Sequence, residues 1–257
     1  MIDIELPSFN LSGKTALVTG ATSGFGRRFA RVLAKAGARV ALTGRRADRL
    51  EALSDEIEAH GGRALPIQMD VTDMEAVART LETAETELGP LDILVNNAGV
   101  NVQALATDIT PDSYNRIMDT NVKGAFFMAT DCGRRMIARG QGGRIINIAS
   151  IAANTVLPGL SVYCMSKAAI AMMTKSLARE WARHNINVNA MCPGFIETEL
   201  NDEWFSSELG QKQIQGFPRR RLGVEQDLDG LLLLLASDHS RLITGSLFTI
   251  DDGQSLK

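Results

Sequence analysis

The chain has 257 residues, 45% of them hydrophobic, and its 27 lysine and arginine residues against 30 aspartate and glutamate residues give a net charge of −3. This is enough chain for one large α/β domain spanning residues 1–257 with a sizeable core. There is no basic surplus to bind nucleic acid or an anionic membrane. Three cysteines without metal or redox spacing, and a start without a basic region, lead us to expect a cytoplasmic protein with reduced thiols, no metal and no signal peptide.

The first predicted strand, within residues 14–19, runs into a glycine-rich turn. The turn reads Gly20-Ala-Thr-Ser-Gly24-Phe-Gly26, and an amphipathic helical pattern continues from it to Gly37. A strand, a glycine turn and a helix in this order let the backbone approach a pyrophosphate at the helix N-terminus. The spacing Gly-x-x-x-Gly-x-Gly departs from the generic dinucleotide fingerprint, so a flexible loop is the alternative. We expect a dinucleotide site that includes Gly20, Thr22, Ser23, Gly24, Phe25 and Gly26.

The second predicted strand covers residues 39–43 and is followed by Gly44, Arg45 and Arg46. At this place NAD-binding units tend to carry an acidic residue for the ribose hydroxyls, whereas NADP-binding units carry arginine for the 2′-phosphate. No carboxylate ends this strand, and a guanidinium can bind phosphate through two parallel hydrogen bonds. Arg45 and Arg46 therefore favour NADP(H), with NAD(H) left open, and two solvated arginines are the alternative.

Strand and helix patterns alternate along the rest of the chain. A helical face within residues 50–57 ends at Gly61-Gly62, and Thr72 with Glu75 predicts a capping box at the start of the next helix. Further strands are predicted at 91–95, 144–148, 186–191 and 247–250, with a long helix starting at Thr110-Pro111, another capped by Ser161, and a buried helix face at 231–235. This alternation predicts a single Rossmann-type, doubly wound parallel sheet flanked by helices.

Tyr163 and Lys167 stand four residues apart in Tyr-Cys-Met-Ser-Lys, so they share one face of a helix. A phenol titrates at about pH 10, but a neighbouring ammonium favours the phenolate and can lower the phenol pKa by roughly 1–3. Tyr163 then becomes a usable general acid or base. Such a pair is common by chance in amphipathic helices, and it gains weight here from Ser150, thirteen residues earlier, and from the nucleotide site.

These motifs together resemble the short-chain dehydrogenase/reductase family, in its single-domain branch, over residues 11–255. The family's glycine motif appears at 19–26, its Asp-Val pair at 70–71 and its Asn-Asn-Ala-Gly motif at 96–99. Asn121 and Ser150 lie in the settings of the family's catalytic asparagine and serine. Residues 193–198 resemble the segment that holds the nicotinamide carboxamide. The departures from the family pattern are Phe25, Cys164, Met165 and Asp252, the last of which stands where relatives often have glycine.

The resemblance implies seven strands in the order 3-2-1-4-5-6-7, with ligands at their carboxyl ends. It implies that Ser150 and Tyr163 bind the substrate carbonyl oxygen, that Lys167 lowers the Tyr163 pKa and holds the nicotinamide ribose, and that Asn121 holds a relay water. The cofactor-binding residues that it adds are Asp70, Val71, Asn97, Ala98, Gly99, Tyr163, Lys167, Pro193, Gly194, Ile196 and Thr198.

The chain resembles 3-oxoacyl-thioester reductases most and carbonyl reductases next, which implies NADPH-dependent reduction of a ketone or 3-oxoacyl group to the secondary alcohol. An NAD-dependent alcohol, sugar or steroid dehydrogenase working in the oxidative direction is the alternative. Enoyl reductases of related fold space the tyrosine and lysine further apart. An inactive nucleotide sensor would be expected to lack one of the four groups, and all four are present.

The family has a mobile lid at a segment that matches about residues 199–217. Its apolar side chains here, Trp204, Phe205, Leu209, Ile214 and Phe217, either line a pocket for an acyl or cyclic substrate or pack the lid itself. Family members usually form tetramers, so we expect a homotetramer, with a dimer as the second choice. Its contacts would include Ala125, Phe126, Ala129, Ala168, Ala169, Met172 and Met173.

Overall fold

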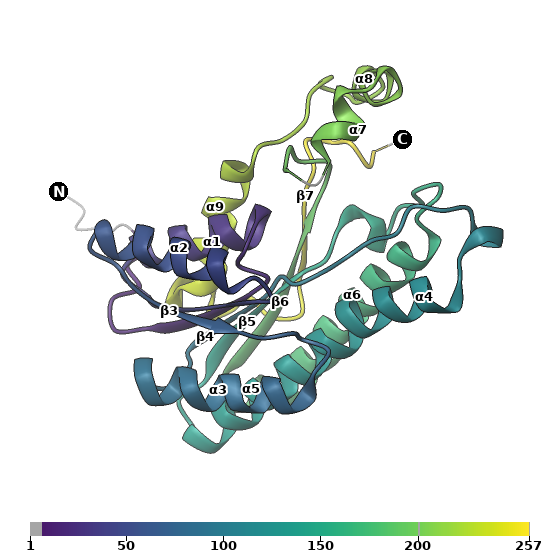
Figure 1. The fold of residues 1–257 in the computed structure, drawn as a ribbon. Coiled ribbons are helices and arrows are strands. Elements are labelled where there is room, and N and C mark those ends of the chain that lie inside the picture. Colours follow the sequence, from purple (N-terminus) through teal and green to yellow (C-terminus); the bar gives the residue numbers. More distant parts are fainter. Residues whose placement is uncertain (1–6, 200, 257) are drawn as a thin grey trace.

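A seven-stranded parallel sheet forms the centre of the computed structural model, which describes residues 7–199 and 201–256 (Figure 1). The strands pair in the order β3-β2-β1-β4-β5-β6-β7, so the predicted doubly wound order is confirmed. Their bounds are β1 Thr15–Thr19, β2 Arg39–Gly44, β3 Arg63–Gln68, β4 Ile93–Asn96, β5 Gly143–Ile148, β6 Ile186–Pro193 and β7 Leu247–Ile250. The start of the chain that we assessed for a signal peptide (residues 1–6) and one position of the expected lid (residue 200) lie outside the described residues.

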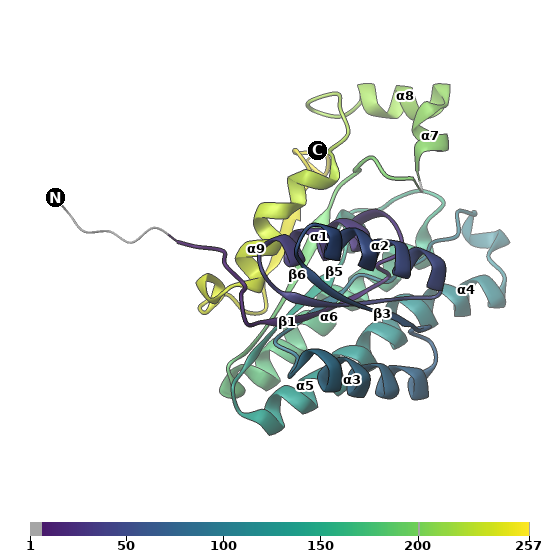
Figure 2. The same ribbon diagram turned by 60° about the vertical axis from the view of Figure 1, so that its left-hand side comes forward.

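Helices cover both faces of the sheet (Figures 1 and 2). On one face lie α1 (Gly24–Lys35), α2 (Ala47–Ala59) and α9 (Asp229–Ala236), and on the other α3 (Met74–Leu88), α4 (Pro111–Met118), α5 (Ala125–Arg139) and α6 (Ser161–Trp181). Two short helices, α7 (Asp202–Ser206) and α8 (Glu208–Gln215), project beyond the sheet near the C-terminus (Figure 1). Within the described part of the chain, none of the helices has both the length and the apolar character that crossing a membrane requires.

Each strand contributes to two separate cores because successive side chains point to opposite faces of a sheet. In β1, Ala16 and Val18 join the core under α1, α2 and α9, whereas Leu17 joins the core under α3, α5 and α6. All three side chains are fully buried. A strand buried on both faces reads as a continuous apolar run, which is the pattern that the sequence shows here.

Two predicted helix caps are wrong. The capping residue of α3 is Asp73, whose Oδ1 accepts hydrogen bonds from the N–H groups of Glu75 and Ala76, both at 3.0 Å. Thr72 is unavailable for this role because its hydroxyl donates to Asp70 Oδ1 at 2.8 Å. Ser161 is the first residue inside α6 and does not cap it. The cap predicted for α4 is confirmed, since Thr110 accepts from Ser113 N at 3.2 Å and Pro111 follows it.

The long helix predicted to begin at Thr110-Pro111 is divided by a π-helical turn at Asp119–Gly124, which separates α4 from α5. Turns of this kind are rare and often mark functional sites. Asn121 lies within the turn and is buried.

Candidate active site

Parallel strands present their carboxyl ends at one edge of the sheet, and most of the predicted site residues follow such ends. The first site residue after, or at the end of, each of the strands β1 to β6 is respectively Gly20, Arg45, Asp70, Asn97, Ser150 and Pro193. The structure therefore brings the expected cofactor and catalytic segments to the same edge.

The glycine-rich turn after β1 packs so tightly against α1 and the loop after β4 that residues larger than glycine would not fit. Gly20 and Gly24 have left-handed backbones, with φ of +68° and +49°. A Cβ atom on Gly26 would lie 2.2 Å from the Gly20 carbonyl oxygen, so α1 can approach the turn only with glycine there. Asn97 donates from Nδ2 to the Thr19 carbonyl oxygen at 2.9 Å and thereby ties this turn to the loop after β4.

The start of α1 fits the pyrophosphate of a dinucleotide. Within the described residues of α1, the first turn carries no acidic side chain, and Ser23 places no side-chain cap on its N–H groups. Uncapped N–H groups and the positive end of the helix dipole bind anions. Arg46 adds a positive charge beside them, because its Nη2 donates to Thr22 Oγ1 at 2.6 Å and to Ser23 Oγ at 2.9 Å.

The end of β2 leaves little room for a carboxylate and presents two guanidiniums. A Cβ atom on Gly44 would lie 2.8 Å from Thr22 Cγ2, so an acidic residue here would have to displace Thr22. Arg45 is 67% exposed at the side chain, and its contact with Asp70 is long at 3.9 Å. The Arg45 guanidinium can therefore turn toward a ligand at little cost, since exposed ion pairs contribute little.

Phe25, an unusual residue in the glycine turn, is partly buried and packs against the core. Its ring lies 6.0 Å from that of Phe29, which is fully buried under α1. The aromatic side chain at this position is therefore accommodated by the core beneath α1.

Helix α6 places Tyr163 and Lys167 on one face, as their spacing predicts. Lys167 is 6% exposed; its Nζ donates to the Ile148 carbonyl oxygen at 2.8 Å and lies 5.5 Å from the centre of the Tyr163 ring. Ser150 follows β5 and accepts a hydrogen bond from Ala152 N at 3.1 Å. The Ser150 hydroxyl is also near enough to the Tyr163 phenol to favour its phenolate form. The three side chains thus form one group at the edge of the sheet.

Burial dominates the proton affinities of this group. It raises the pKa of the Tyr163 phenol above its ordinary value, and the nearby Ser150 hydroxyl only partly offsets the rise. The cost of burying a phenolate is thus the largest effect on this pKa in the protein alone, and a lowering of the Tyr163 pKa by Lys167 stays a prediction. Burial also lowers the pKa of Lys167 to about 8, so its ammonium form still prevails at neutral pH.

Asn121 links the helix that carries Tyr163 to the loop after β4. Its Oδ1 accepts from Val100 N at 2.8 Å, and its Nδ2 donates to Val100 O at 2.9 Å and to Ser166 Oγ at 3.0 Å. Ser166 in turn donates to the Tyr163 carbonyl oxygen at 2.7 Å. The sequence offers Ser166 as part of the Tyr-Cys-Met-Ser-Lys motif, but its structural role depends on contacts that only the fold creates.

The backbone at Gly99 lies close to the side chains of both Asn121 and Lys167. A Cβ atom on it would meet Asn121 Oδ1 at 3.4 Å and Lys167 Nζ at 3.7 Å. The Asn-Asn-Ala-Gly motif after β4 therefore passes directly beside the asparagine and the lysine.

The segment after β6 carries the remaining predicted cofactor residues. Pro193 ends the strand, and Gly194 donates from its N–H to the Ile250 carbonyl oxygen at 2.9 Å. Ile196 is buried, and Thr198 donates from its N–H to Asn201 Oδ1 at 2.9 Å. The segment is thus held on one side by the end of β7 and on the other by the start of the lid segment, by which we mean residues 201–217.

Most large apolar side chains of the lid segment pack within it or against its base. Phe205 is 5% exposed and lies 5.8 Å from the ring of Phe195, and Phe217 stacks on the same ring at 5.3 Å. Trp204 is half-exposed and donates from Nε1 to Gln213 Oε1 at 2.9 Å. Of the two interpretations, packing of the lid accounts for Phe205 and Phe217.

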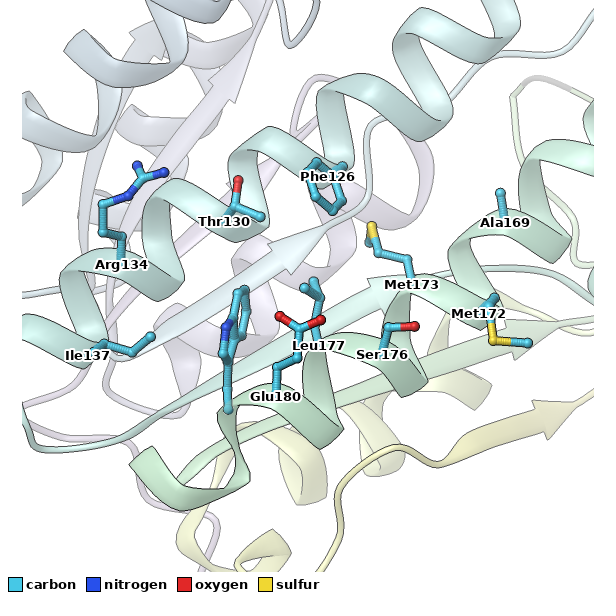
Figure 3. A pocket seen from close by; sticks show the side chains of 11 residues that line it. Phe126, Thr130, Arg134, Ile137, Ala169, Met172, Met173, Ser176, Leu177 and Glu180 are labelled. Atoms are coloured by element: carbon cyan, nitrogen blue, oxygen red, sulfur yellow. The ribbon is translucent and has the colours of Figure 1, made fainter.

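A large surface hollow of about 650 Å³ lies away from these groups, between α5 and α6 (Figure 3). Its lining includes Phe126, Met172 and Trp181, with the charged Arg134 and Glu180. Two residues expected at a subunit contact on these helices, Ala125 and Ala129, are buried in the core, whereas the buried Met173 also lines the hollow.

Comparison with known proteins agrees with this geometry. The family model for short chain dehydrogenase matches residues 14–209. An NAD-dependent glycerol dehydrogenase of Listeria innocua is 38% identical, with 97% of this chain and 96% of the relative covered. A 3-oxoacyl-[acyl-carrier-protein] reductase of Staphylococcus aureus is 36% identical, with 93% and 97% covered. The crystal structure of a gluconate 5-dehydrogenase from Burkholderia cenocepacia, in complex with NADP and tartrate, superposes with a TM-score of 0.93 at 33% identity, covering 97% of this chain and 98% of that one.

The similarity to these relatives therefore extends over almost the whole chain. The chain belongs to the short-chain dehydrogenase family and is an NAD(P)-dependent oxidoreductase that acts on alcohol or ketone groups.

Proposed function

We propose that this protein interconverts a ketone and its secondary alcohol with NADP(H), using Ser150, Tyr163, Lys167 and Asn121. The observation that carries the proposal is the grouping of these side chains beside the loop after β4, at the edge where the glycine turn also lies. When bound, the nicotinamide cofactor would supply or take up the hydride. The whole chain, as one domain, would serve this single site.

The hydrogen-bond donors of the four side chains suggest a catalytic role for each residue. Ser150 and Tyr163 would hydrogen-bond the substrate oxygen, and in reduction Tyr163 would pass its phenol proton to that oxygen as negative charge develops there. Lys167, as an ammonium, would stabilise the phenolate left behind and bind the nicotinamide ribose. Proton transfer of this kind contributes roughly 10²–10⁴-fold in rate. Asn121 would fix α6 through Ser166, and a relay water beside Lys167 remains part of the proposal.

The end of β2 supports NADP(H) over NAD(H). Glycine at position 44 leaves no carboxylate for ribose hydroxyls, and Arg45 and Arg46 are suited to a 2′-phosphate. The remaining proposed cofactor contacts are those of the glycine turn, the loops after β3 and β4, and the segment after β6. NAD(H) stays the alternative, since a relative that is 38% identical is named as NAD-dependent.

Cofactor choice can be reversed by design. Gly44→Asp with Arg45→Ala should shift preference from NADPH toward NADH, because the carboxylate binds ribose hydroxyls and the phosphate partner is gone. Thr22→Ser, added to both, removes the Cγ2 that the new side chain would meet and keeps the hydroxyl that Arg46 contacts. Thr22→Ser alone is the matched control. The measurement is kcat/KM with each cofactor, and a wild type that already prefers NADH would refute the arginine interpretation.

For the substrate, the structure reduces the support for a long apolar chain. Phe205 and Phe217 are used in packing the lid segment against Phe195, so they offer little surface to an acyl group. We therefore propose a polyhydroxylated chain such as a sugar acid or polyol, as in the named activities of two of the relatives. A 3-oxoacyl thioester is the second candidate, favoured by the half-exposed Trp204 and by the named activity of another relative.

Initial rates on a small panel of substrates would decide between the two candidate substrate classes. The panel holds a keto sugar acid, its alcohol, glycerol, a simple cyclic ketone and a 3-oxoacyl thioester, each with both cofactors. The proposal predicts the highest kcat/KM for a polyhydroxylated substrate with NADP(H). A clear preference for the thioester would replace the first candidate by the second, and no rate on any member would contradict both. We also propose a cytoplasmic location, in line with three free cysteines.

A further inference from the structure

The last turn of the described chain, residues 251–255, contacts both the segment that leads into the lid segment and the segment that leaves it. It follows β7 and is closed by its own hydrogen bonds, in which Asp251 Oδ1 accepts from Gly253 N at 3.0 Å and Asp251 Oδ2 accepts from Ser255 N at 2.8 Å. We call residues 251–255 the C-terminal turn.

One set of contacts fixes the segment that leads into the lid. Gln254 Oε1 accepts from Phe195 N at 2.6 Å, and Gln254 Nε2 donates to Phe195 O at 3.3 Å. Packing is so close that a Cβ atom on Gly194 would lie 2.3 Å from Gln254 Oε1 and 2.6 Å from Asp251 Cβ. Glycine at position 194 is thus required by the C-terminal turn.

A second set fixes the segment that leaves the lid. The Asp252 carboxylate pairs with Arg219 Nε at 3.1 Å and with Arg221 Nε at 2.8 Å. Two arginines of the Arg219-Arg220-Arg221 run are therefore paired with a single carboxylate.

Asp252 occupies a backbone conformation that favours glycine. Its φ is +53°, in the left-handed region, which aspartate and asparagine tolerate better than most residues. Where relatives often have glycine, this chain carries a carboxylate that joins two arginines. The segments before and after the lid segment also meet directly, since Gly223 N donates to Phe195 O at 3.0 Å and Glu197 N donates to Gly223 O at 2.9 Å.

We propose that the C-terminal turn positions both ends of the lid segment, and that Asp252 is the positioning residue that couples them. Through Gln254 and Phe195, a shift of Arg219 and Arg221 would be passed to the segment after β6, which we propose binds the nicotinamide. The predicted effect on catalysis rests on the proposed function. The coupling between the two segments does not, because it can be measured in the protein without cofactor or substrate.

The test compares Asp252→Asn with wild type. Asparagine tolerates the same φ and removes only the charge. Amide hydrogen exchange of the free protein should become faster by at least about threefold in residues 195–199 and in residues 219–223, as expected when a local opening is made easier. With a substrate from the panel, KM should rise about three- to tenfold while kcat changes less than about twofold, the size expected for losing two partly exposed ion pairs.

Three further variants keep the test specific. Arg219→Ala with Arg221→Ala should reproduce the effects of Asp252→Asn, and lysine at both positions should largely restore wild-type behaviour because the charges return. Asp238→Asn is the matched control, since Asp238 pairs at 3.4 Å with Arg144, the second residue of β5, away from the turn. It should leave both measurements unchanged.

Unchanged exchange in either segment would overturn the coupling, as would faster exchange confined to residues 219–223. Faster exchange in both segments with an unchanged KM would overturn the effect on substrate. If no panel substrate reacts, the exchange measurement still decides whether the turn couples the two ends, so failure of the proposed function is recognised separately.

Discussion

Burial acts on the phenol of Tyr163 and on the ammonium of Lys167 in opposite directions. Both groups lose the hydration of their charged forms, so the pKa of the phenol rises and that of the ammonium falls to about 8. At neutral pH the phenol therefore keeps its proton and is ready to donate it. Alcohol oxidation needs the phenolate instead, so we expect the oxidative rate to increase with pH above neutrality.

Replacing Tyr163 by phenylalanine removes the proton donor and keeps the ring. Turnover of Tyr163→Phe should fall by at least about 10²-fold, the lower end of proton-transfer contributions. The dissociation constant of NADPH should change little, which titration of cofactor fluorescence measures. The increase of oxidation with pH should also disappear from any residual activity. Near-normal turnover on every substrate that the wild type reduces would show that Tyr163 has a different role.

The candidate site could be predicted from the sequence at the level of residue identities but not of proton affinities. Tyr163, Lys167 and Ser150 are recognisable because their order and spacing are local. Their pKa shifts depend on how deeply β5, α6 and the loop after β4 bury them, and this is set by packing between distant segments. The links from Asn121 to Val100 and Ser166 are of the same kind.

Among the secondary-structure elements, alternating strand and helix patterns predicted the doubly wound parallel sheet, and the family resemblance implied its strand order. Local competition decided the caps. Thr72 matches a capping motif, but Asp70 takes its hydroxyl and Asp73 performs the capping one residue later. For the aromatic residues of the lid, too, the sequence does not show the contact partner, because an apolar side chain in a loop can pack against either a ligand or a neighbouring ring. Only the position of Phe195, which belongs to another segment, separates these alternatives.

Trp204 and Phe205 should therefore respond differently to truncation. Phe205→Ala removes a buried ring from the base of the lid, so affinity should fall for all substrates alike and the melting temperature should decrease. Trp204→Ala removes a half-exposed ring, and KM should rise more for bulky substrates than for small ones, with the NADPH dissociation constant unchanged. Gln213→Ala is the control, because it removes only the hydrogen-bond partner of Trp204. A uniform loss in Trp204→Ala with a lower melting temperature would place Trp204 in packing too.

At the scale of the whole molecule, α5 and α6 expose an apolar surface on the face opposite to their core contacts. Phe126 and Phe127 are each 40% exposed and Met172 is 62% exposed. The predicted contact set mixed two faces of these helices, which explains why Ala125 and Ala129 turn out to be buried. What remains is a hollow bordered by Arg134 and Glu180 (Figure 3), so that a two-fold axis could bring opposite charges together.

We therefore expect a homotetramer that uses this surface, with a dimer as the second choice. Light scattering at micromolar concentration should give about four times the chain mass of 27.8 kDa. Met172→Glu should lower the measured mass, because it places a charge on an apolar surface that pairs with its own copy. Leu242→Glu is the matched control, since Leu242 is 94% exposed outside α5 and α6 and the same charge there should leave the mass unchanged. A monomeric wild type, or equal masses for wild type and Met172→Glu, would show that these helices do not form the subunit contact.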